Sequence, residues 1–342
     1  MLQRIHYADL LRISAAFMVI LLHVSAQYWN VLPVTCTDWF IFHVYDSLAR
    51  PAVAIFVMLS GMFLLHPAKQ ITLPQLFQRY CKKLVLILLF WTCFYATWHD
   101  VIWTAYRGDA INWQTVAISL QSGHYHLWYC YMLLGLYLLL PFLRKIAADR
   151  TLLLYFLALC LCFTVILPVL PWRWAKTIRM SMYFSFTAGF TGYFLLGYFL
   201  RTTTVNKRTR LLCYLAAMGG LAFTIFASYH KALTSGVAFG YYNPFTLNTL
   251  TLTIAVFLFY QYEIPHLLQR CQAMIGTLVE NSLGIYLIHP FVLAVLQYYN
   301  VDALFFAPTV LSVPTVALLT FLLSWFATTI LRLCPIFEKY LC

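Results

Sequence analysis

The chain has 342 residues, of which 63% are hydrophobic and only 9% are charged, and its net charge is +12. This balance excludes a water-soluble domain of that length, because too few polar side chains are present to cover its surface. The basic residues form short clusters between apolar runs rather than one stripe or tail, which excludes a nucleic-acid partner.

Apolar runs long enough to cross a hydrocarbon core of roughly 30 Å follow one another along the whole chain. They predict an all-helical polytopic membrane protein with membrane lipids around it, in which residues 1–342 form a single transmembrane domain with no fused extracytoplasmic domain. We expect about ten transmembrane helices, at residues 9–29, 49–66, 84–104, 126–143, 151–170, 183–200, 211–228, 245–262, 275–299 and 308–331.

The loops between these helices differ in their basic content, and this difference predicts the orientation. With both termini in the cytoplasm, the outward-facing basic residues are Arg50, Arg107, Arg173, Lys176, Arg179 and Lys231, and the remainder of the 22 Lys and Arg residues face the cytoplasm. Such an asymmetry over short loops fixes the orientation of a membrane protein. We therefore expect both termini to be cytoplasmic.

The first expected helix carries Arg12 and His23. Eleven positions at 100° each return the His23 side chain to within about 20° of Arg12, roughly 16 Å further along the axis. Ionisable groups are costly in lipid, so this face should look into the bundle, with Arg12 near the cytoplasm and His23 deeper. A guanidinium that binds phosphate and an imidazole that accepts a proton suit an elongated donor such as coenzyme A. The alternative is that Asp9 and Arg12 form a capping and topology pair, with His23 a hydrogen-bonded core residue.

Basic residues gather again before the third expected helix, at Arg79, Lys82 and Lys83. At α-helical spacing they lie about one turn apart and can grip a nucleotide phosphate. An ordinary cytoplasmic anchor requires the same residues.

The fourth expected helix begins with His124, Tyr125, His126 and Trp128 at the outer interface. Aromatic faces with polar rims suit sugar rings, although aromatic belts arise at this depth in any case. His124 and His126 are two residues apart and should point apart on a helix, so we expect no metal site there.

The ninth expected helix places Ser282, Tyr286 and His289 on one face, at steps of four and three. His289 and His23 are each about 14 residues in from the cytoplasmic end of their helix, so they should lie at similar depth. His289 either orients His23 or a substrate, or it satisfies backbone groups that Pro290 leaves free.

We expect the carboxylates, including Asp46 and Asp100, to lie in loops or at the edges of the predicted spans. Coupled carriers generally need acids within the membrane or unwound helices, which counts against a lipid or glycan transporter. Transport without acyl transfer nevertheless stays the alternative function. The ten cysteines include no CxxC pair, and we interpret them as small buried hydrophobes rather than metal ligands.

Taken in order, these motifs resemble those of the membrane-bound acyltransferase family 3, which includes O-acyltransferases of bacterial cell-surface glycans. The pattern of Arg12, ten residues and His23 resembles the family's hallmark. Residues 53–61, parts of 126–141, residues 192–197 and residues 282–290 resemble other family segments, in the same order along the chain. In size and layout the chain resembles the stand-alone members.

The resemblance implies that His23 is the catalytic histidine, that Arg12 is its partner, and that a basic pair engages acyl-CoA. That pair is typically two arginines three apart, whereas this chain has Arg79 followed by Lys82 and Lys83. His23 would act as general base or carry the acyl group itself, and the sequence leaves both routes open.

The resemblance also implies a multi-pass protein of the bacterial cytoplasmic membrane that uses acetyl-CoA as donor and needs no metal. The acceptor would be a hydroxyl of an extracytoplasmic glycan or lipid-linked saccharide. The residues expected to bind it are Tyr125, His126 and Trp128 at the outer mouth and Ser282, Tyr286 and His289 at the centre.

Overall fold

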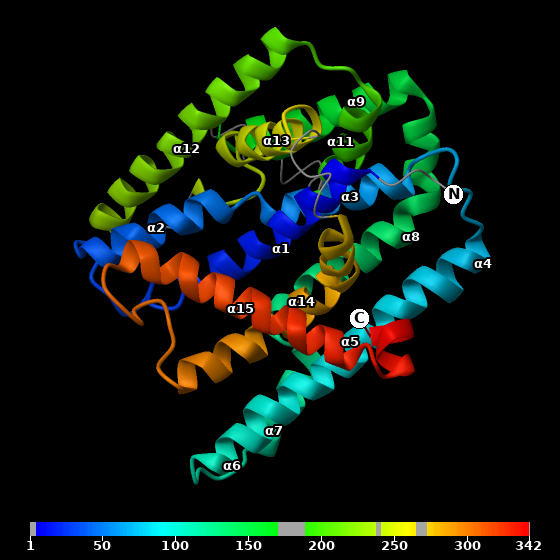
Figure 1. The fold of residues 1–342 in the computed structure, drawn as a ribbon. Helices are drawn as coiled ribbons and strands as arrows, with labels where there is room; N and C mark the ends of the chain where they lie inside the picture. Colours follow the sequence, from blue (N-terminus) through cyan, green and yellow to red (C-terminus); the bar gives the residue numbers. More distant parts are fainter. Residues whose placement is uncertain (1–4, 170–188, 237–240, 265–271, 342) are drawn as a thin grey trace.

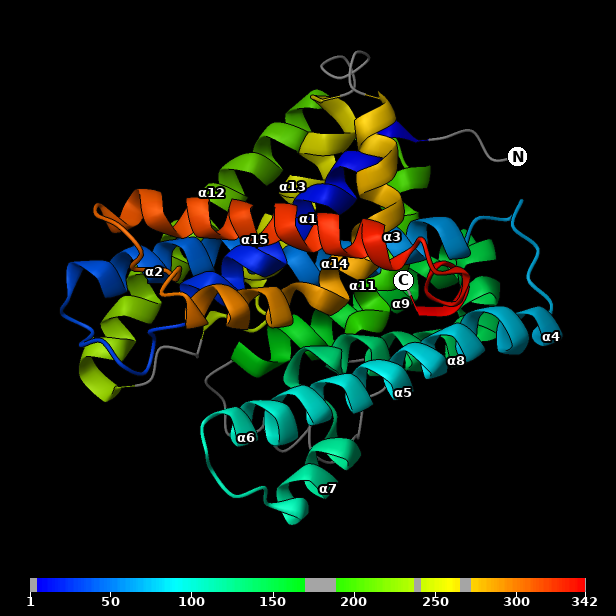
Figure 2. The same cartoon turned by 60° about the horizontal axis from the view of Figure 1, so that its bottom comes forward.

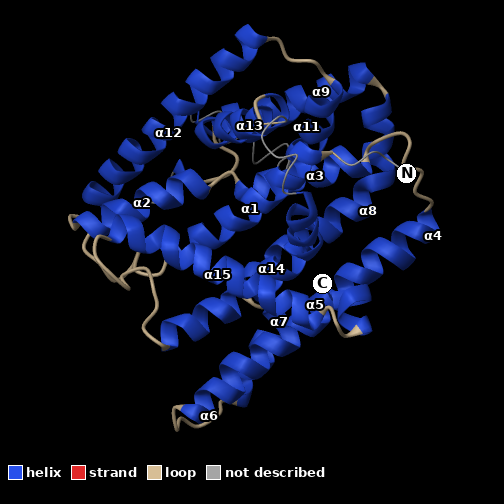
Figure 3. Ribbon diagram, in the orientation of Figure 1, coloured by secondary structure: helices blue, strands red, loops and turns tan. Residues whose placement is uncertain are grey.

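The computed structural model describes residues 5–169, 189–236, 241–264 and 272–341, and throughout these ranges the chain forms helices and loops without a strand (Figure 3). The longer helices are α1 (His6–Ser25), α2 (Thr37–Ala49), α3 (Ala52–Leu64), α5 (Lys82–Ala96), α7 (Trp113–Ser122), α8 (Trp128–Ala148), α9 (Arg150–Cys160), α11 (Phe190–Thr202), α12 (Lys207–Ser235), α13 (Leu247–Tyr262), α14 (Gln272–Tyr298) and α15 (Thr309–Leu331). Short helical pieces are α4 (Leu73–Gln75), η1 (Leu76–Cys81), η2 (Thr97–Trp103), α6 (Thr104–Tyr106), η3 (Tyr125–Leu127), η4 (Leu161–Ile166), η5 (Leu167–Val169) and η9 (Phe337–Leu341).

The prediction of an all-helical polytopic membrane protein is confirmed. Within the described ranges, seven helical runs are long and apolar enough to cross a membrane, and Arg150–Ile166 and Leu247–Tyr262 are shorter apolar helices. Each of the ten expected segments contains a helix. Residues 170 and 183–188 of the expected spans lie outside the described residues, as do Arg173, Lys176 and Arg179.

Among the described residues, two of the longer helices were not expected from the sequence. The structure forms α2 in a stretch taken as a loop, and with α3 it makes one apolar run, Thr37–Leu64. The expectation that Asp46 lies in a loop or at the edge of a span is therefore wrong, since Asp46 lies within this run and is buried. The second unexpected helix, α7, follows the loop after α6.

The central helix of the bundle is α1, which packs against α2, α3, α14 and α15. Figures 1 and 2 place the start of α1 and the end of α15 at one end of the bundle, while the end of α1 and the start of α2 lie at the other. This arrangement agrees with an even number of crossings. His23 lies in the last turn of α1 and Arg12 in its first half, so the two residues belong to opposite halves of the bundle.

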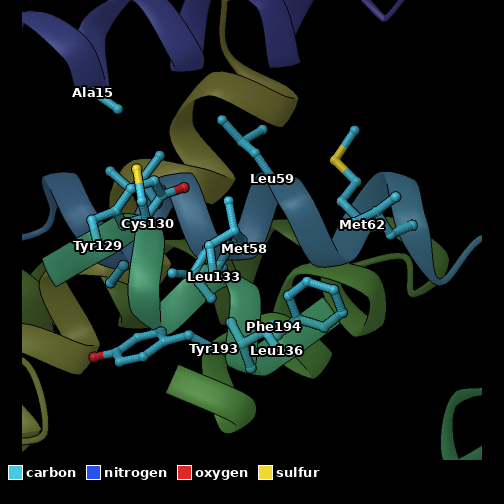
Figure 4. Close-up of a cluster of buried hydrophobic side chains, with 14 of the residues drawn as sticks. Ala15, Met58, Leu59, Met62, Tyr129, Cys130, Leu133, Leu136, Tyr193 and Phe194 are labelled. Atoms are coloured by element: carbon cyan, nitrogen blue, oxygen red, sulfur yellow. The ribbon is translucent and has the colours of Figure 1, made fainter. Parts of the chain in front are cut away.

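The closest helix contact joins α3 to α11, which come from two of the segments that resemble the acyltransferase family. A Cβ at Gly61 would overlap the carbonyl oxygen of Phe194, and a Cβ at Gly197 would overlap that of Met58. Glycine lets two helix backbones approach closely. Inside a membrane the hydrophobic effect does not drive helices together, so they associate through such close van der Waals contacts at small residues. Figure 4 shows Met58 and Phe194 in the buried cluster beside this crossing.

Candidate functional site

A group of imidazole and phenol rings surrounds the end of α1. The rings of His23 and His289 stack with centroids 5.2 Å apart and planes 28° apart, and Tyr125 meets His23 edge-on at 5.3 Å. His126 lies edge-on to His289 at 5.7 Å. The prediction that His23 and His289 lie at similar depth is confirmed, and the fold brings them into contact.

Pro290 explains how α14 holds His289. A proline has no N–H, so the carbonyl of Tyr286, four residues earlier, loses its helical partner. Nδ1 of His289 donates a hydrogen bond of 2.7 Å to that carbonyl. The two roles considered for His289 are therefore compatible, because satisfying the backbone at Pro290 also fixes the ring that stacks on His23.

The next carbonyl of α14, that of Leu287, anchors the rest of the cluster. It accepts hydrogen bonds from the Tyr95 hydroxyl at 2.7 Å and from Nε2 of His126 at 3.2 Å. In return, the Tyr286 hydroxyl donates to the carbonyl of His126. Figure 2 shows α14 changing direction partway along its length, as expected of a helix with an internal proline. Hydrogen bonds of site side chains therefore connect the bend of α14 to α5 and η3.

His124 and His126 point toward each other, so the expectation that they point apart is wrong. Their Nδ1 atoms are 2.7 Å apart. The reason is that residue 124 is not helical: it caps η3 with an extended backbone, and Gly123 before it has φ of +75°. Since Nε2 of His126 donates to Leu287, we assign a lone pair to its Nδ1, which accepts the proton of Nδ1 of His124. Nε2 of a neutral His124 is then an acceptor.

Besides His124, two imidazoles in the cluster have a lone pair available for chemistry. Nε2 of His289 is buried and has no hydrogen-bond partner among the described residues. His23 is half-buried and, within the same ranges, makes ring contacts but no hydrogen bond to the protein. An imidazole whose lone pair is not engaged by the protein can accept a proton from a bound hydroxyl.

A charged residue, Arg50, lies near His23. Its Nε donates to Oδ2 of Asp46 at 2.8 Å, its Nη2 contacts the same oxygen, and its guanidinium lies 4.1 Å from the centre of the Tyr242 ring. Tyr242 in turn contacts Nδ1 of His43. The charge of Arg50 acts electrostatically on the His23 ring. Arg50 was expected at the outer end of the span 49–66, and the structure places it at the junction of α2 and α3, inside the apolar run Thr37–Leu64.

At the opposite end, cations surround the last turn of α3. Arg12 and Arg201 each lie 5.7 Å from the centre of the Phe63 ring. Arg201 also donates to the carbonyl of Met62 at 3.0 Å, and Arg144 donates to that of Leu64 at 2.7 Å. These hydrogen bonds satisfy carbonyl groups that the end of α3 leaves without a helical partner. The remaining N–H groups of the arginines can bind an anion.

The nearby loop contributes His66. Burial, together with the charges of Arg201 and Arg144, lowers the pKa of His66. Its Nδ1 accepts a hydrogen bond of 3.2 Å from the amide of Ala68, as a neutral imidazole can.

The predicted basic cluster lies on the outside of the helix that contains α5. Arg79 and Lys82 are exposed and Lys83 is half-buried. The α-helical spacing expected for them does not hold, because Arg79 belongs to the π-helical stretch Leu76–Cys81.

Two predicted acceptor residues stand apart from the ring cluster. Trp128 is exposed and packs on Phe190 of α11, with centroids 5.7 Å apart. The Ser282 hydroxyl bonds to the carbonyl of Val279 in its own helix at 2.8 Å. The structure brings together Tyr125, His126, Tyr286 and His289 from the predicted set. The described residues contain no group of three or more His, Cys, Asp or Glu arranged to hold a metal ion.

Sequence reasoning missed Tyr95, Arg50 and Asp100 as neighbours of the site. Tyr95 stacks on His124 with ring centroids 4.1 Å apart. It lies within an apolar run of the sequence, so nothing in the pattern distinguished it from a core residue. Arg50 was interpreted only as an outward-facing cation at the start of a span, although the spacing of four from Asp46 is a pattern that favours a helical ion pair.

Comparison with families of known proteins gives a match over most of the chain. Residues 5–329 match the family model described as an acyltransferase domain. No curated protein and no solved structure matches the chain.

Proposed function

The chain belongs to this acyltransferase family, and on that premise we propose that it is an O-acetyltransferase of a bacterial cytoplasmic membrane. It takes the acetyl group from acetyl-CoA in the cytoplasm and passes it to a hydroxyl of an extracytoplasmic glycan or lipid-linked saccharide. The observation that carries the proposal is His23: an accessible imidazole, free of hydrogen bonds in the described part of the chain, stacked on the buried ring of His289.

The donor end of the proposal rests on the cations around α3. Arg12, Arg144 and Arg201 surround the last turn of this helix, half a bundle away from His23. Guanidinium groups bind phosphate oxygens by paired, charge-assisted hydrogen bonds. The phosphates of acetyl-CoA bind here, with Arg79, Lys82 and Lys83 attracting them from the surface, and the pantetheine arm runs along the Arg12 face of α1 toward His23.

The chemistry at His23 balances without a metal or an external oxidant. The acceptor hydroxyl gives its proton to the imidazole, its oxygen forms a bond to the thioester carbonyl carbon, and the bond from that carbon to sulfur breaks. The coenzyme A thiolate then takes the proton from the imidazolium. In the two-step variant the imidazole attacks first and carries the acetyl group before the hydroxyl receives it.

The charge of Arg50 suits the same reaction. The tetrahedral intermediate of acyl transfer carries negative charge on the former carbonyl oxygen, and a cation held in place beforehand stabilises that charge. Arg50 is held by Asp46 and by the face of Tyr242.

The test is acetyl transfer from radiolabelled acetyl-CoA in inside-out membrane vesicles. Wild-type protein is compared with His23→Ala at matched expression, and with His230→Ala as control, because His230 is an exposed residue on α12. We expect label in envelope glycan with the wild type and the control, and none with His23→Ala.

Label retained on the protein in the absence of acceptor supports the two-step route. Equal labelling of all three proteins rules out His23 as the catalytic base. If no protein takes up label from a range of short acyl-CoAs, transport without acyl transfer becomes the better explanation.

A further inference from the structure

A small cavity opens beside the ring cluster. Its volume is about 110 Å³, and the polar side chains that line it include His99, Asp100, Ser119, His124 and Tyr125, with Tyr95 on its wall. Tyr125 is shared between this cavity and His23, whose ring it meets at 5.3 Å. The cavity therefore lies next to the candidate base and at the end of the bundle predicted to face away from the cytoplasm.

Asp100 gives this cavity a built acceptor. The residue is only 8% exposed, and its Oδ1 accepts a hydrogen bond of 2.7 Å from Nδ1 of His99. Its other oxygen, Oδ2, is buried with no hydrogen-bond partner among the described residues. A buried carboxylate oxygen without a donor is costly. A side-chain rotation that turns this oxygen into the cavity lets a ligand with a hydrogen-bond donor satisfy it.

His124 presents a second acceptor to the same space. The hydrogen bonds that run from Leu287 through His126 leave Nε2 of a neutral His124 with its lone pair, as assigned above. The ring itself is held flat against Tyr95, with planes 15° apart. Two fixed acceptors in a cavity of this size select a molecule with neighbouring donors, such as the vicinal hydroxyls of a sugar ring.

We propose that this cavity is the acceptor subsite and that it binds a saccharide, with one hydroxyl donating to Oδ2 of Asp100 and another to Nε2 of His124. The inference rests on the proposed function for the identity of the acceptor, but it concerns binding and is tested without acyl-CoA. Tyr125 lines the cavity and also contacts the His23 ring, so the bound sugar lies one side chain away from the base.

The experiment measures saccharide binding by saturation-transfer NMR to the purified protein in detergent, with methyl α-glucoside and methyl N-acetyl-α-glucosaminide as probes and methylamine as the cationic probe. Asp100→Asn is compared with Asp109→Asn, the same chemical change at an exposed carboxylate near the same end. Asn keeps the shape but replaces an acceptor by a donor. We expect at least about a tenfold loss of glycoside affinity in Asp100→Asn and no loss in Asp109→Asn.

A second variant tests the cavity independently, in case Asp100→Asn fails to fold. Ser119→Phe fills the cavity from α7, where Ser119 is half-buried, and leaves the carboxylate in place. It should abolish glycoside binding while keeping the thermal unfolding midpoint of the wild type. Glycoside binding that is equal in all variants, or absent from the wild type, overturns the proposal, and so does Asp100-dependent binding of methylamine alone. Asp100-dependent glycoside binding without any acetyl transfer supports the subsite and rejects the proposed function.

Discussion

The ring of His289 stacks on that of His23 and is fixed from behind by the Tyr286 carbonyl that Pro290 leaves free. Pro290 thus helps to fix the ring of His289, and that ring stacks on His23 of α1. The contact between the two histidines is a stacking contact, so His289 positions His23 by packing and leaves the His23 nitrogens to the substrate.

His289→Asn should separate the structural role of this residue from its positioning role. The asparagine amide can still donate to the Tyr286 carbonyl, but it offers no ring to stack on His23. We expect the unfolding midpoint to stay near that of the wild type while kcat falls by about 100-fold. His289→Ala should in addition lose about 1–3 kcal/mol of stability, because the carbonyl is left without a donor. Thermal unfolding and acetyl-transfer kinetics on the same samples check both statements, and an asparagine variant with wild-type kcat would contradict them.

Pro290→Ala should make α14 more regular and the enzyme worse. Alanine restores an N–H that competes with His289 for the Tyr286 carbonyl, so the bend relaxes and the anchors from Tyr95 and His126 to Leu287 weaken. We expect an unchanged or higher unfolding midpoint together with a kcat reduced by about 100-fold. A variant that is less stable but fully active would show that the bend serves folding alone.

The crossing of α3 and α11 predicts a contrast between glycines. Gly61→Ala and Gly197→Ala each push a methyl group into the backbone of the facing helix, so each should cost about 1–3 kcal/mol or more. Gly135→Ala on α8 is the matched control, because no atom of the described residues lies within 4 Å of the position of its Cβ. That change should be neutral or stabilising by up to about 1 kcal/mol, since alanine favours a helix. Unfolding midpoints in one detergent compare the three variants, and equal effects at Gly61 and Gly135 would refute the close approach.

Whether a feature could be predicted from the sequence depends on the interactions that produce it. The first helix and its Arg12 and His23 could be predicted because both lie on one regular helix with a simple period. α2 could not, because Asp46 reads as a loop residue until the ion pair with Arg50, four residues on, is known to be satisfied inside the run. The contact of His124 with His126 depends on the non-helical backbone after Gly123, which no helical spacing describes. Contacts between helices, such as that of Tyr95 with Leu287, depend on tertiary packing alone.

The Arg50 and Asp46 pair should behave as a coupled unit. Arg50→Gln leaves the carboxylate of Asp46, which is 1% exposed, without its cation, so stability should fall by about 3–5 kcal/mol. The double variant Arg50→Gln with Asp46→Asn removes both charges and should recover much of that loss. Its kcat should nevertheless stay low, because the cation near His23 is still absent. A double-mutant cycle in stability and in kcat measures the two effects, and recovery of both together would contradict a role for Arg50 in the reaction.

Binding of acetyl-CoA should draw a proton onto His66. In the free protein, burial and the charges of Arg201 and Arg144 lower the pKa of His66, so its imidazole is less protonated at a given pH than that of an ordinary histidine. Phosphate groups bound among these arginines favour the charged imidazole and raise that pKa, and protons are therefore taken up on binding. Because binding takes up protons, affinity should rise as the pH falls toward the ordinary range of histidine. Calorimetric titration at mildly acidic pH in two buffers of different ionisation enthalpy gives the number of protons bound. Coenzyme A titrates as well, so His66→Gln supplies the baseline and His230→Gln the control. Equal proton uptake by His66→Gln and the wild type would place the phosphates away from the end of α3.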